Sequence, residues 1–176
     1  MILNKLHHVA LRCKDAGETA RFYTEVLGMK LAAAPSLDRV PSTGEFSPHL
    51  NVFLEMEDGS LLDFIDVPLS PEAMKDTNTP AWVQHLALDV GSEEALLEVK
   101  RRVQAWGGHV IGPVDHGFSM SIYFFEPSGH RLEMVWNHNL PQLAEMTKTA
   151  EADLAHWQAK KKAGWEIPAD TKKAVA

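Results

Sequence analysis

The chain of 176 residues is short of three things: cysteine, long apolar runs and an excess of positive charge. Its one cysteine, Cys13, excludes an internal disulfide and is expected to be a small core side chain. Seventeen Lys and Arg against 24 Asp and Glu give a net charge of -7, which argues against nucleic acid or an anionic membrane as a partner. No apolar run approaches the roughly 18 residues of a membrane span, and the first residues do not resemble a signal peptide. We therefore expect a cytoplasmic protein that acts on a small molecule.

The first part of the chain predicts a strand, a helix and further strands. Residues 5–13 alternate, so that His8 shares a face with Ala10 and Arg12. A helix is expected from the N-cap Asp15 to Gly28, then a strand over 29–34. Residues 35–49 contain three prolines and are expected to form a long polar loop. Residues 51–56 and 60–67 predict a hairpin whose Asp-Gly pair forms the turn.

The same pattern then returns, which indicates an internal repeat. Residues 83–90 align with the first strand, so that His85 matches His8 and not His7. A second helix is expected after Ser92, followed by a strand over 109–114 and a hairpin within 115–136. In this hairpin Glu133 matches Asp63. The repeat predicts an α+β fold in which two βαβββ modules form one curved, cup-shaped mixed sheet.

We expect a single domain made of three parts. The first module covers residues 1–67, the second covers residues 81–136, and a C-terminal helical extension covers residues 137–176. Within the extension, residues 140–162 have apolar side chains at helical intervals and a Lys-rich end, which is typical of an amphipathic helix. Such a helix packs on its own domain or on a sister subunit, and we expect a homodimer.

Glu133 is the most informative carboxylate in the sequence. It lies between Leu132 and Met134 in an apolar strand, where an ionised group needs a cation or a hydrogen-bonded partner. An approximate twofold axis between the modules would bring His8 and His85 to it. Two imidazoles and one carboxylate suit Fe(II), and also Mn(II) or Zn(II), with coordination positions left for a substrate. The alternative is that each histidine is a hydrogen-bonded structural residue.

Several stretches resemble one known family. The strand openings HVAL and HLAL, FYTEVLG in the first helix and PSGHRLE in the last hairpin are similar to the vicinal oxygen chelate superfamily of glyoxalases, fosfomycin and bleomycin resistance proteins, epimerases and extradiol dioxygenases. The resemblance covers residues 5–136. Within it, His116, Tyr123, the segment FFEPSG and Glu133 follow one another as in the signature of type I extradiol dioxygenases, the one-domain enzymes above all.

This resemblance implies roles for individual residues. His8, His85 and Glu133 would bind the metal, expected to be Fe(II), while His116 and Tyr123 would be catalytic in the second sphere. The separation of ten residues between Tyr123 and Glu133 is even, so a hairpin centred near Ser128 places both on one face. The implied activity is ring cleavage of a catechol-like diol that chelates the metal through both oxygens. Tyr123 as a core aromatic residue and His116 as a surface residue are the structural alternatives.

Two other functions stay open at this stage. Asp63 is in the position of a fourth ligand in glyoxalase-type members, and four ligands would favour a lyase or isomerase with Zn, Ni, Co or Mn. The acid-base histidine that larger extradiol enzymes carry before the second metal-binding histidine is absent from residues 69–74. The third possibility is a binding protein of the bleomycin resistance type, without catalysis. The long loop shapes the pocket, and His49 within it is a further candidate for the site.

Overall fold

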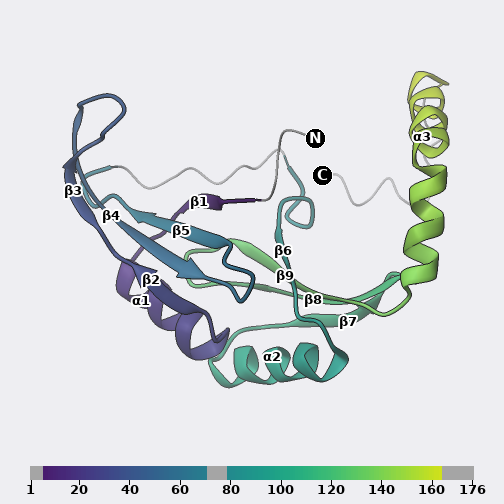
Figure 1. Ribbon diagram of the computed structural model, residues 1–176, viewed down its shortest axis with the longest axis horizontal. Coiled ribbons are helices and arrows are strands. Elements are labelled where there is room, and N and C mark those ends of the chain that lie inside the picture. The colour runs from purple at the N-terminus through teal and green to yellow at the C-terminus, as the bar shows by residue number, and fades with distance from the viewer. Residues whose placement is uncertain (1–5, 71–78, 164–176) are drawn as a thin grey trace, which may run out of the picture. The chain divides into compact units, whose positions relative to one another are not determined.

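The computed structural model describes residues 6–70 and 79–163. Its contacts divide the chain into two compact units, residues 1–137 and residues 138–176. The first unit contains two successive modules, each with a strand, a helical segment and then further strands, four in the first module and three in the second, which confirms the predicted α+β class (Figure 1). Residues 71–78, in the segment between the two predicted modules, fall outside the described residues.

The first module begins with a strand and a capped helix. Its elements are β1 (His8–Arg12), α1 (Ala16–Arg21), the π-helical turn η1 (Phe22–Val26), β2 (Lys30–Ala33), β3 (Ser36–Arg39), β4 (Phe46–Glu55) and β5 (Leu61–Asp66). Asp15 is the predicted N-cap, and its Oδ1 accepts a hydrogen bond of 2.6 Å from the backbone N–H of Glu18. Gly28 ends the helical segment with a φ of 77°, a conformation that favours glycine.

The second module repeats this order with one strand fewer. It consists of β6 (Leu86–Asp89), α2 (Glu93–Ala105), β7 (Ile111–Asp115), β8 (Ser119–Phe125) and β9 (Arg131–Asn137). The predicted cap of its helix is confirmed, because Ser92 Oγ accepts a hydrogen bond of 3.2 Å from the backbone N–H of Ala95. The repeat inferred from the sequence is therefore a repeat of structure.

The two modules form two sheets, and the prediction of one curved sheet shared by both modules is wrong in this respect. The first sheet has the order β1-β5-β4-β2, with β3 paired to β4, and the second has the order β6-β9-β8-β7. In both sheets the first strand of the module runs parallel to its last strand, and the remaining pairs are antiparallel. Equivalent residues therefore lie at equivalent positions, with Ala10 beside Asp63 and Ala87 beside Glu133.

The prediction of a loop over residues 35–49 is wrong in part. Strand β3 lies within it, and β4 begins at Phe46. Leu37 pairs with His49 and Arg39 pairs with Phe46, so this end of β4 is held by β3 alone, beyond the last residue that pairs with β5. The three prolines indicate a loop. Part of the segment is nevertheless a strand, because its backbone N–H and C=O groups form hydrogen bonds with the long strand β4.

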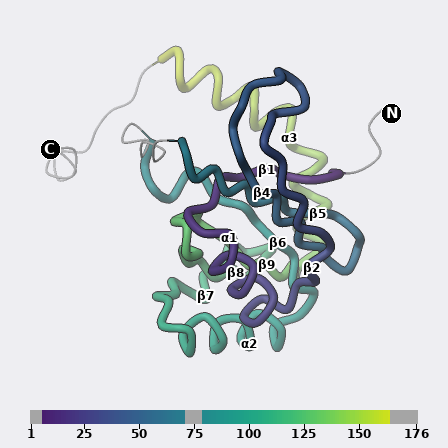
Figure 2. The backbone as a smooth tube through the Cα atoms, turned by 90° about the vertical axis from the view of Figure 1, so that its left-hand side faces the viewer, coloured from purple at the N-terminus to yellow at the C-terminus, as the bar shows by residue number. Residues whose placement is uncertain are grey.

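The core lies between the sheets and the helices α1 and α2, which are on the same side of both sheets (Figure 1). Phe22 joins the modules, because its ring centroid lies 6.4 Å from that of Phe124 in the second sheet. His130 strengthens the junction by donating its Nε2–H to the backbone oxygen of Arg12 over 2.7 Å. Figure 2 views this junction, with α1 and α2 next to each other. Strand alternation then directs the other face of each sheet away from these helices.

The second unit contains α3 (Leu140–Ala163), in agreement with the helix predicted over 140–162. The structure describes all of α3, and it contains no buried residue. Lys160, Lys161 and Lys162 lie in its last turn, where positive charge favours the helix dipole. Among the described residues, no helix combines the length and apolar character that crossing a membrane requires.

Candidate functional site

Strand pairing in the second module places Tyr123 opposite Glu133. The two residues are partners in the antiparallel β8–β9 pair, which confirms the prediction that they share a face. Leu132 and Met134, on either side of Glu133, are buried in the core. Because side chains alternate along a strand, Glu133 and Tyr123 point to the sheet face away from α2. Glu133 is nevertheless only 8% exposed, so its carboxylate requires partners.

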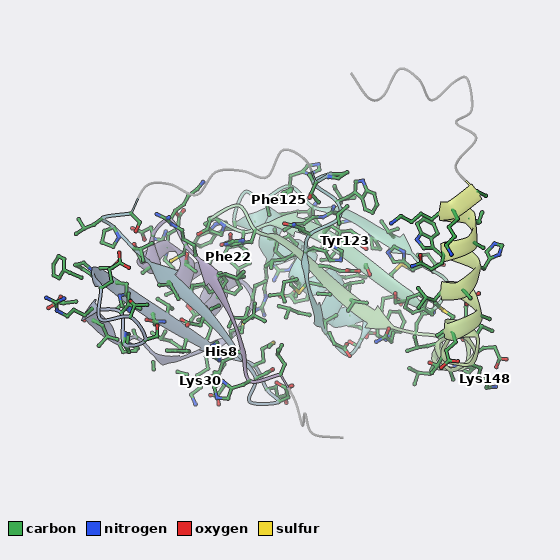
Figure 3. The ribbon with its side chains drawn as sticks, turned by 90° about the horizontal axis from the view of Figure 1, so that it is seen from above. His8, Phe22, Lys30, Tyr123, Phe125 and Lys148 are labelled. Carbon is green, nitrogen blue, oxygen red and sulfur yellow. The ribbon has the colours of Figure 1, made fainter. Side chains whose placement is uncertain are left out.

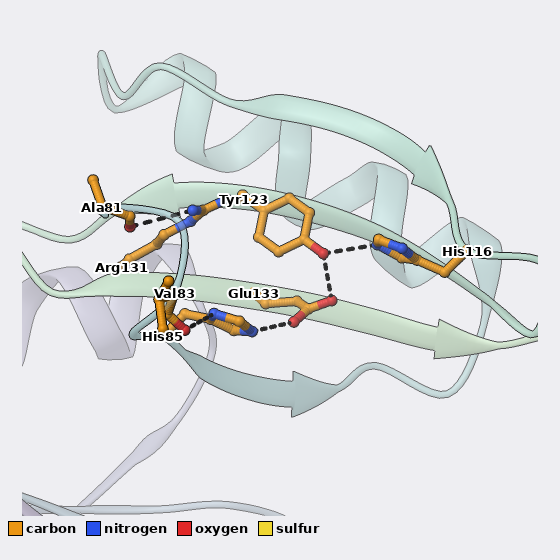
Figure 4. A network of polar contacts seen from close by, with 7 residues as sticks. All are labelled: Ala81, Val83, His85, His116, Tyr123, Arg131 and Glu133. Atoms are coloured by element: carbon orange, nitrogen blue, oxygen red, sulfur yellow. Dashed lines mark hydrogen bonds and ion pairs between the residues drawn. The ribbon is translucent and has the colours of Figure 1, made fainter. Parts of the chain in front are cut away.

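Four side chains form a continuous polar chain around Glu133 (Figure 4). His85 Nε2 lies 2.9 Å from Glu133 Oε2, and the Tyr123 hydroxyl donates to Glu133 Oε1 over 2.9 Å. His116 Nε2 lies 2.8 Å from the Tyr123 hydroxyl oxygen. Because the single hydroxyl hydrogen of Tyr123 points to Glu133, His116 must donate its Nε2–H to Tyr123. The order of donation is therefore from His116 to Tyr123 to Glu133.

The geometry of His85 suits a metal ligand. Its Nδ1–H donates to the backbone oxygen of Val83 over 3.1 Å, since a carbonyl oxygen can only accept. In a neutral ring this leaves the lone pair on Nε2, which faces a carboxylate oxygen of Glu133. His85 Nε2 and Glu133 Oε2 are both acceptors in this state, and at 2.9 Å they need a positive species to hold them together. Either a proton on His85 Nε2 or a metal ion bound by both atoms would do so. An imidazole nitrogen beside a carboxylate is a donor set for Fe(II), Mn(II) or Zn(II).

The pKa of Tyr123 is raised above its ordinary value. Partial burial is the largest cause, because it disfavours the phenolate, and the hydrogen bond and negative charge of Glu133 act in the same direction. The positive charge of Arg131 opposes this shift. Tyr123 therefore keeps its proton near neutral pH and donates it to Glu133 in a hydrogen bond.

A family model matches residues 5–134 of the chain, and its description is Glyoxalase/Bleomycin resistance protein/Dioxygenase superfamily. The chain belongs to this superfamily. This is the vicinal oxygen chelate superfamily whose motifs the sequence resembles. A lactoylglutathione lyase of Haemophilus influenzae is 30% identical over 133 residues, which cover 74% of this chain and 90% of the lyase.

Solved structures of the superfamily have the same fold. A glyoxylase/bleomycin resistance protein/dioxygenase domain from Frankia sp. has a TM-score of 0.64 at 18% identity, over 77% of this chain and 99% of that one. A fosfomycin resistance protein from Listeria monocytogenes, complexed with Mn(II) and sulfate, has a TM-score of 0.55 at 20% identity, over 81% of this chain and 99% of that one. These likenesses establish the fold of this superfamily member.

The first module of this superfamily chain has a set of residues equivalent to those around Glu133. Asp63 corresponds to Glu133 and is 4% exposed, and its two oxygens accept hydrogen bonds of 3.1 and 2.9 Å from Asn51 Nδ2. Phe53 pairs with Asp63 as Tyr123 pairs with Glu133. The module thus keeps a buried carboxylate but has no phenol beside it.

His8 lies on this first module and not with the residues around Glu133. Its Nδ1 is 2.7 Å from Nδ1 of His7, and its ring stands edge-on to Phe53 with centroids 6.4 Å apart. Figure 3 shows His8 and Tyr123 on different modules. Across residues 6–70 and 79–163, no three His, Cys, Asp or Glu side chains are grouped as a metal site. The structure therefore brings together four of the five expected site residues and leaves His8 apart.

Two further placements concern residues outside this group. His49 lies on β4 and donates its Nδ1–H to the backbone oxygen of Ser47 over 2.6 Å, so the fold gives it a local hydrogen bond. Arg131, which the sequence analysis did not single out, places its guanidinium carbon 4.6 Å from the centre of the Tyr123 ring. The sequence could have indicated Arg131, because it lies two residues before Glu133 and residues i and i+2 of a strand share a face.

Proposed function

We propose that this protein is a metal-dependent extradiol dioxygenase that cleaves the ring of a catechol-like diol. The observation that supports it is the polar chain from His116 through Tyr123 to Glu133 and His85. His85 and Glu133 would hold the metal, with Fe(II) for this reaction. Bound there, the metal supplies Lewis acidity and electron transfer to O2. In the overall reaction the carbon–carbon bond beside the diol breaks, and both atoms of O2 enter the product.

The protein's own groups account for the proton steps. Tyr123 holds a proton beside the carboxylate and delivers it to an oxygen of the bound diol or of the product. His116, which donates to the tyrosine oxygen, keeps the phenol oriented, and in its imidazolium form it would return a proton to the phenolate after transfer and become the neutral imidazole. The low exposure of Glu133 limits water at this point and strengthens each hydrogen bond.

His8 completes the proposed metal site from a second copy of the chain. Within one chain it shares the face of the first sheet with Asp63, while His85 and Glu133 are in the second sheet. A twofold dimer can place the first module of each copy against the second module of its partner, which gives two identical sites. The proposed homodimer is then required for metal binding.

Metal binding and oxygen uptake test the proposed reaction. Protein loaded anaerobically with Fe(II) is expected to consume O2 and form a yellow ring-cleavage product with members of a catechol panel. Glu133→Gln should lose the iron and the activity, while Glu57→Gln, in the exposed β4–β5 turn, should keep both. Iron binding without oxygen uptake across the panel contradicts the dioxygenase. Failure to bind any divalent metal identifies instead a non-catalytic binding protein.

Mixed dimers test the placement of His8. His8→Ala and His85→Ala homodimers should both be inactive, but refolding them together should restore about one quarter of the activity. Half of the dimers are then mixed, and one of the two sites in each has both histidines. Sites contained within one chain would give no recovery.

A lyase or isomerase of glyoxalase type is the second candidate. It is favoured by the 30% identity to the lactoylglutathione lyase and by Asp63, a buried carboxylate equivalent to Glu133. In this reading Asp63 is a fourth ligand for Zn, Ni, Co or Mn. Asp63→Ala distinguishes the two functions: loss of metal affinity supports the lyase class, and unchanged affinity supports the three-ligand dioxygenase site.

A further inference from the structure

A cavity of about 110 Å³ is lined in part by Tyr123, whose hydroxyl group belongs to the polar chain that His116, Tyr123, Glu133 and His85 form. Four of its six lining residues are aromatic or aliphatic, and the other two are a histidine and an arginine: His109, Ile111, Tyr123, Phe124, Phe125 and Arg131. An engineered cavity of roughly 150 Å³ holds benzene, so this space suits a small planar group. Tyr123 is thus shared between the cavity and the site around Glu133.

Arg131 is the charged group of this cavity. Its guanidinium is stacked 4.6 Å over the Tyr123 ring, and its Nη1–H donates to the backbone oxygen of Ala81 over 3.3 Å (Figure 4). No carboxylate within the described residues forms an ion pair with it. A guanidinium carries five N–H donors in a planar fork that matches a carboxylate. The cavity therefore contains a positioned cation with donors available to a ligand.

The cavity and the proposed metal site are within reach of one ligand. Arg131 and Glu133 are two residues apart on β9, so their Cα atoms are about 7 Å apart on the same face. Tyr123 contacts both residues, because its hydroxyl donates to Glu133 and its ring stacks against the guanidinium of Arg131. An aromatic ring with a short acidic side chain spans a similar length.

We propose that Arg131 and this cavity form a subsite for a carboxylate on the substrate. The substrate class is then an aromatic vicinal diol with a short acidic side chain, whose diol faces Glu133 and His85 and whose carboxylate pairs with Arg131. The diol end of this assignment rests on the proposed function. The carboxylate end rests on the cavity and the arginine, so it is tested without any metal.

Benzoate and benzamide probe the subsite in the chelator-treated full chain, because they differ in charge but hardly in shape. Ligand-observed NMR should give benzoate at least about a tenfold higher affinity, as expected for charge-assisted hydrogen bonds. Arg131→Gln should abolish this preference, and Arg131→Lys should keep part of it because it retains the charge. Arg101→Gln, on the exposed face of α2, makes the same change in net charge and should leave the preference intact. Thermal unfolding checks that each variant is folded.

Equal affinity for benzoate and benzamide overturns the subsite, and so does a benzoate preference that survives Arg131→Gln in the folded protein. With Fe(II) bound, 3,4-dihydroxyphenylacetate should be preferred over its amide by a similar factor. If neither diol is oxidised while the benzoate preference and its loss in Arg131→Gln persist, the dioxygenase fails and the carboxylate subsite stands. If both diols are oxidised equally well, the subsite fails and the dioxygenase stands.

Discussion

Tyr123 donates its hydroxyl hydrogen to Glu133 across the β8–β9 pair, at a distance of 2.9 Å. At the equivalent place in the first module, Phe53 lies opposite Asp63 and has no hydroxyl to donate. The two modules have therefore kept the same backbone register and differ in the one group that supplies a proton. Of the two modules, only the second therefore has a phenol opposite its buried carboxylate among the described residues.

Tyr123→Phe removes that proton without changing the size of the ring. We expect the metal to stay bound and kcat to fall by roughly 10²-fold or more, the usual contribution of a positioned acid. Steady-state oxygen uptake and metal analysis measure the two quantities. Tyr23→Phe is the matched control, since Tyr23 is buried in the core and its hydroxyl has no partner among the described residues. Wild-type kcat in Tyr123→Phe would contradict the role of the phenol.

Both tyrosines of the chain should resist ionisation in alkali. The pKa of Tyr23 is raised by burial and then by the charge of Glu126, and that of Tyr123 by burial and then by Glu133. The metal-free native protein should therefore show less phenolate absorbance at pH 10 than the unfolded chain, where about half of each tyrosine is ionised. Because the folded state retains these protons, its free energy of unfolding should decrease as the pH rises above about 10. Equal absorbance in the two states would contradict both shifts.

Cys13 should be inert in the native protein. It is 3% exposed, and burial, followed by the negative charge of Asp66, raises the pKa of its thiol to about 11. At pH 8 we expect no reaction with a disulfide reagent such as DTNB until denaturant is added, and then one thiol per chain. The stability associated with this proton is complete below pH 8 and is lost progressively as the pH rises toward 11. Rapid labelling of the native chain would show that the thiol is accessible.

Leu96 and Leu97 are neighbours on α2 with opposite environments. Leu96 is 0% exposed and Leu97 is 45% exposed. Leu96→Ala should lower the free energy of unfolding by roughly 2–5 kcal/mol through lost burial and the cavity that remains. Leu97→Ala should change it by about 0.5 kcal/mol or less. Urea denaturation measures both, and equal losses would mean that α2 is not packed on the second sheet as described.

The sequence determined the local structure because strand alternation, caps and turns are encoded by neighbouring residues. The repeat, the cap at Ser92 and the shared face of Tyr123 and Glu133 all follow from spacings of a few residues. The structure of residues 35–49 could not be predicted from local spacing. The prolines of this segment indicate a loop, and only pairing with β4 makes part of it a strand. Local signals are overridden where a long neighbouring strand supplies the hydrogen bonds.

The sequence also pointed to His85, Glu133, Tyr123 and His116, because residue type and spacing are sufficient for groups on adjacent strands of one module. Their roles in metal binding and catalysis stay predictions. Only the tertiary structure decided that each module has a sheet of its own and that His8 is separate from this group. It also decided that Arg131 is stacked on Tyr123 beside a cavity. A spacing specifies which face of a strand a side chain occupies, but which faces meet depends on how whole sheets pack, and that arises from contacts distant in the sequence.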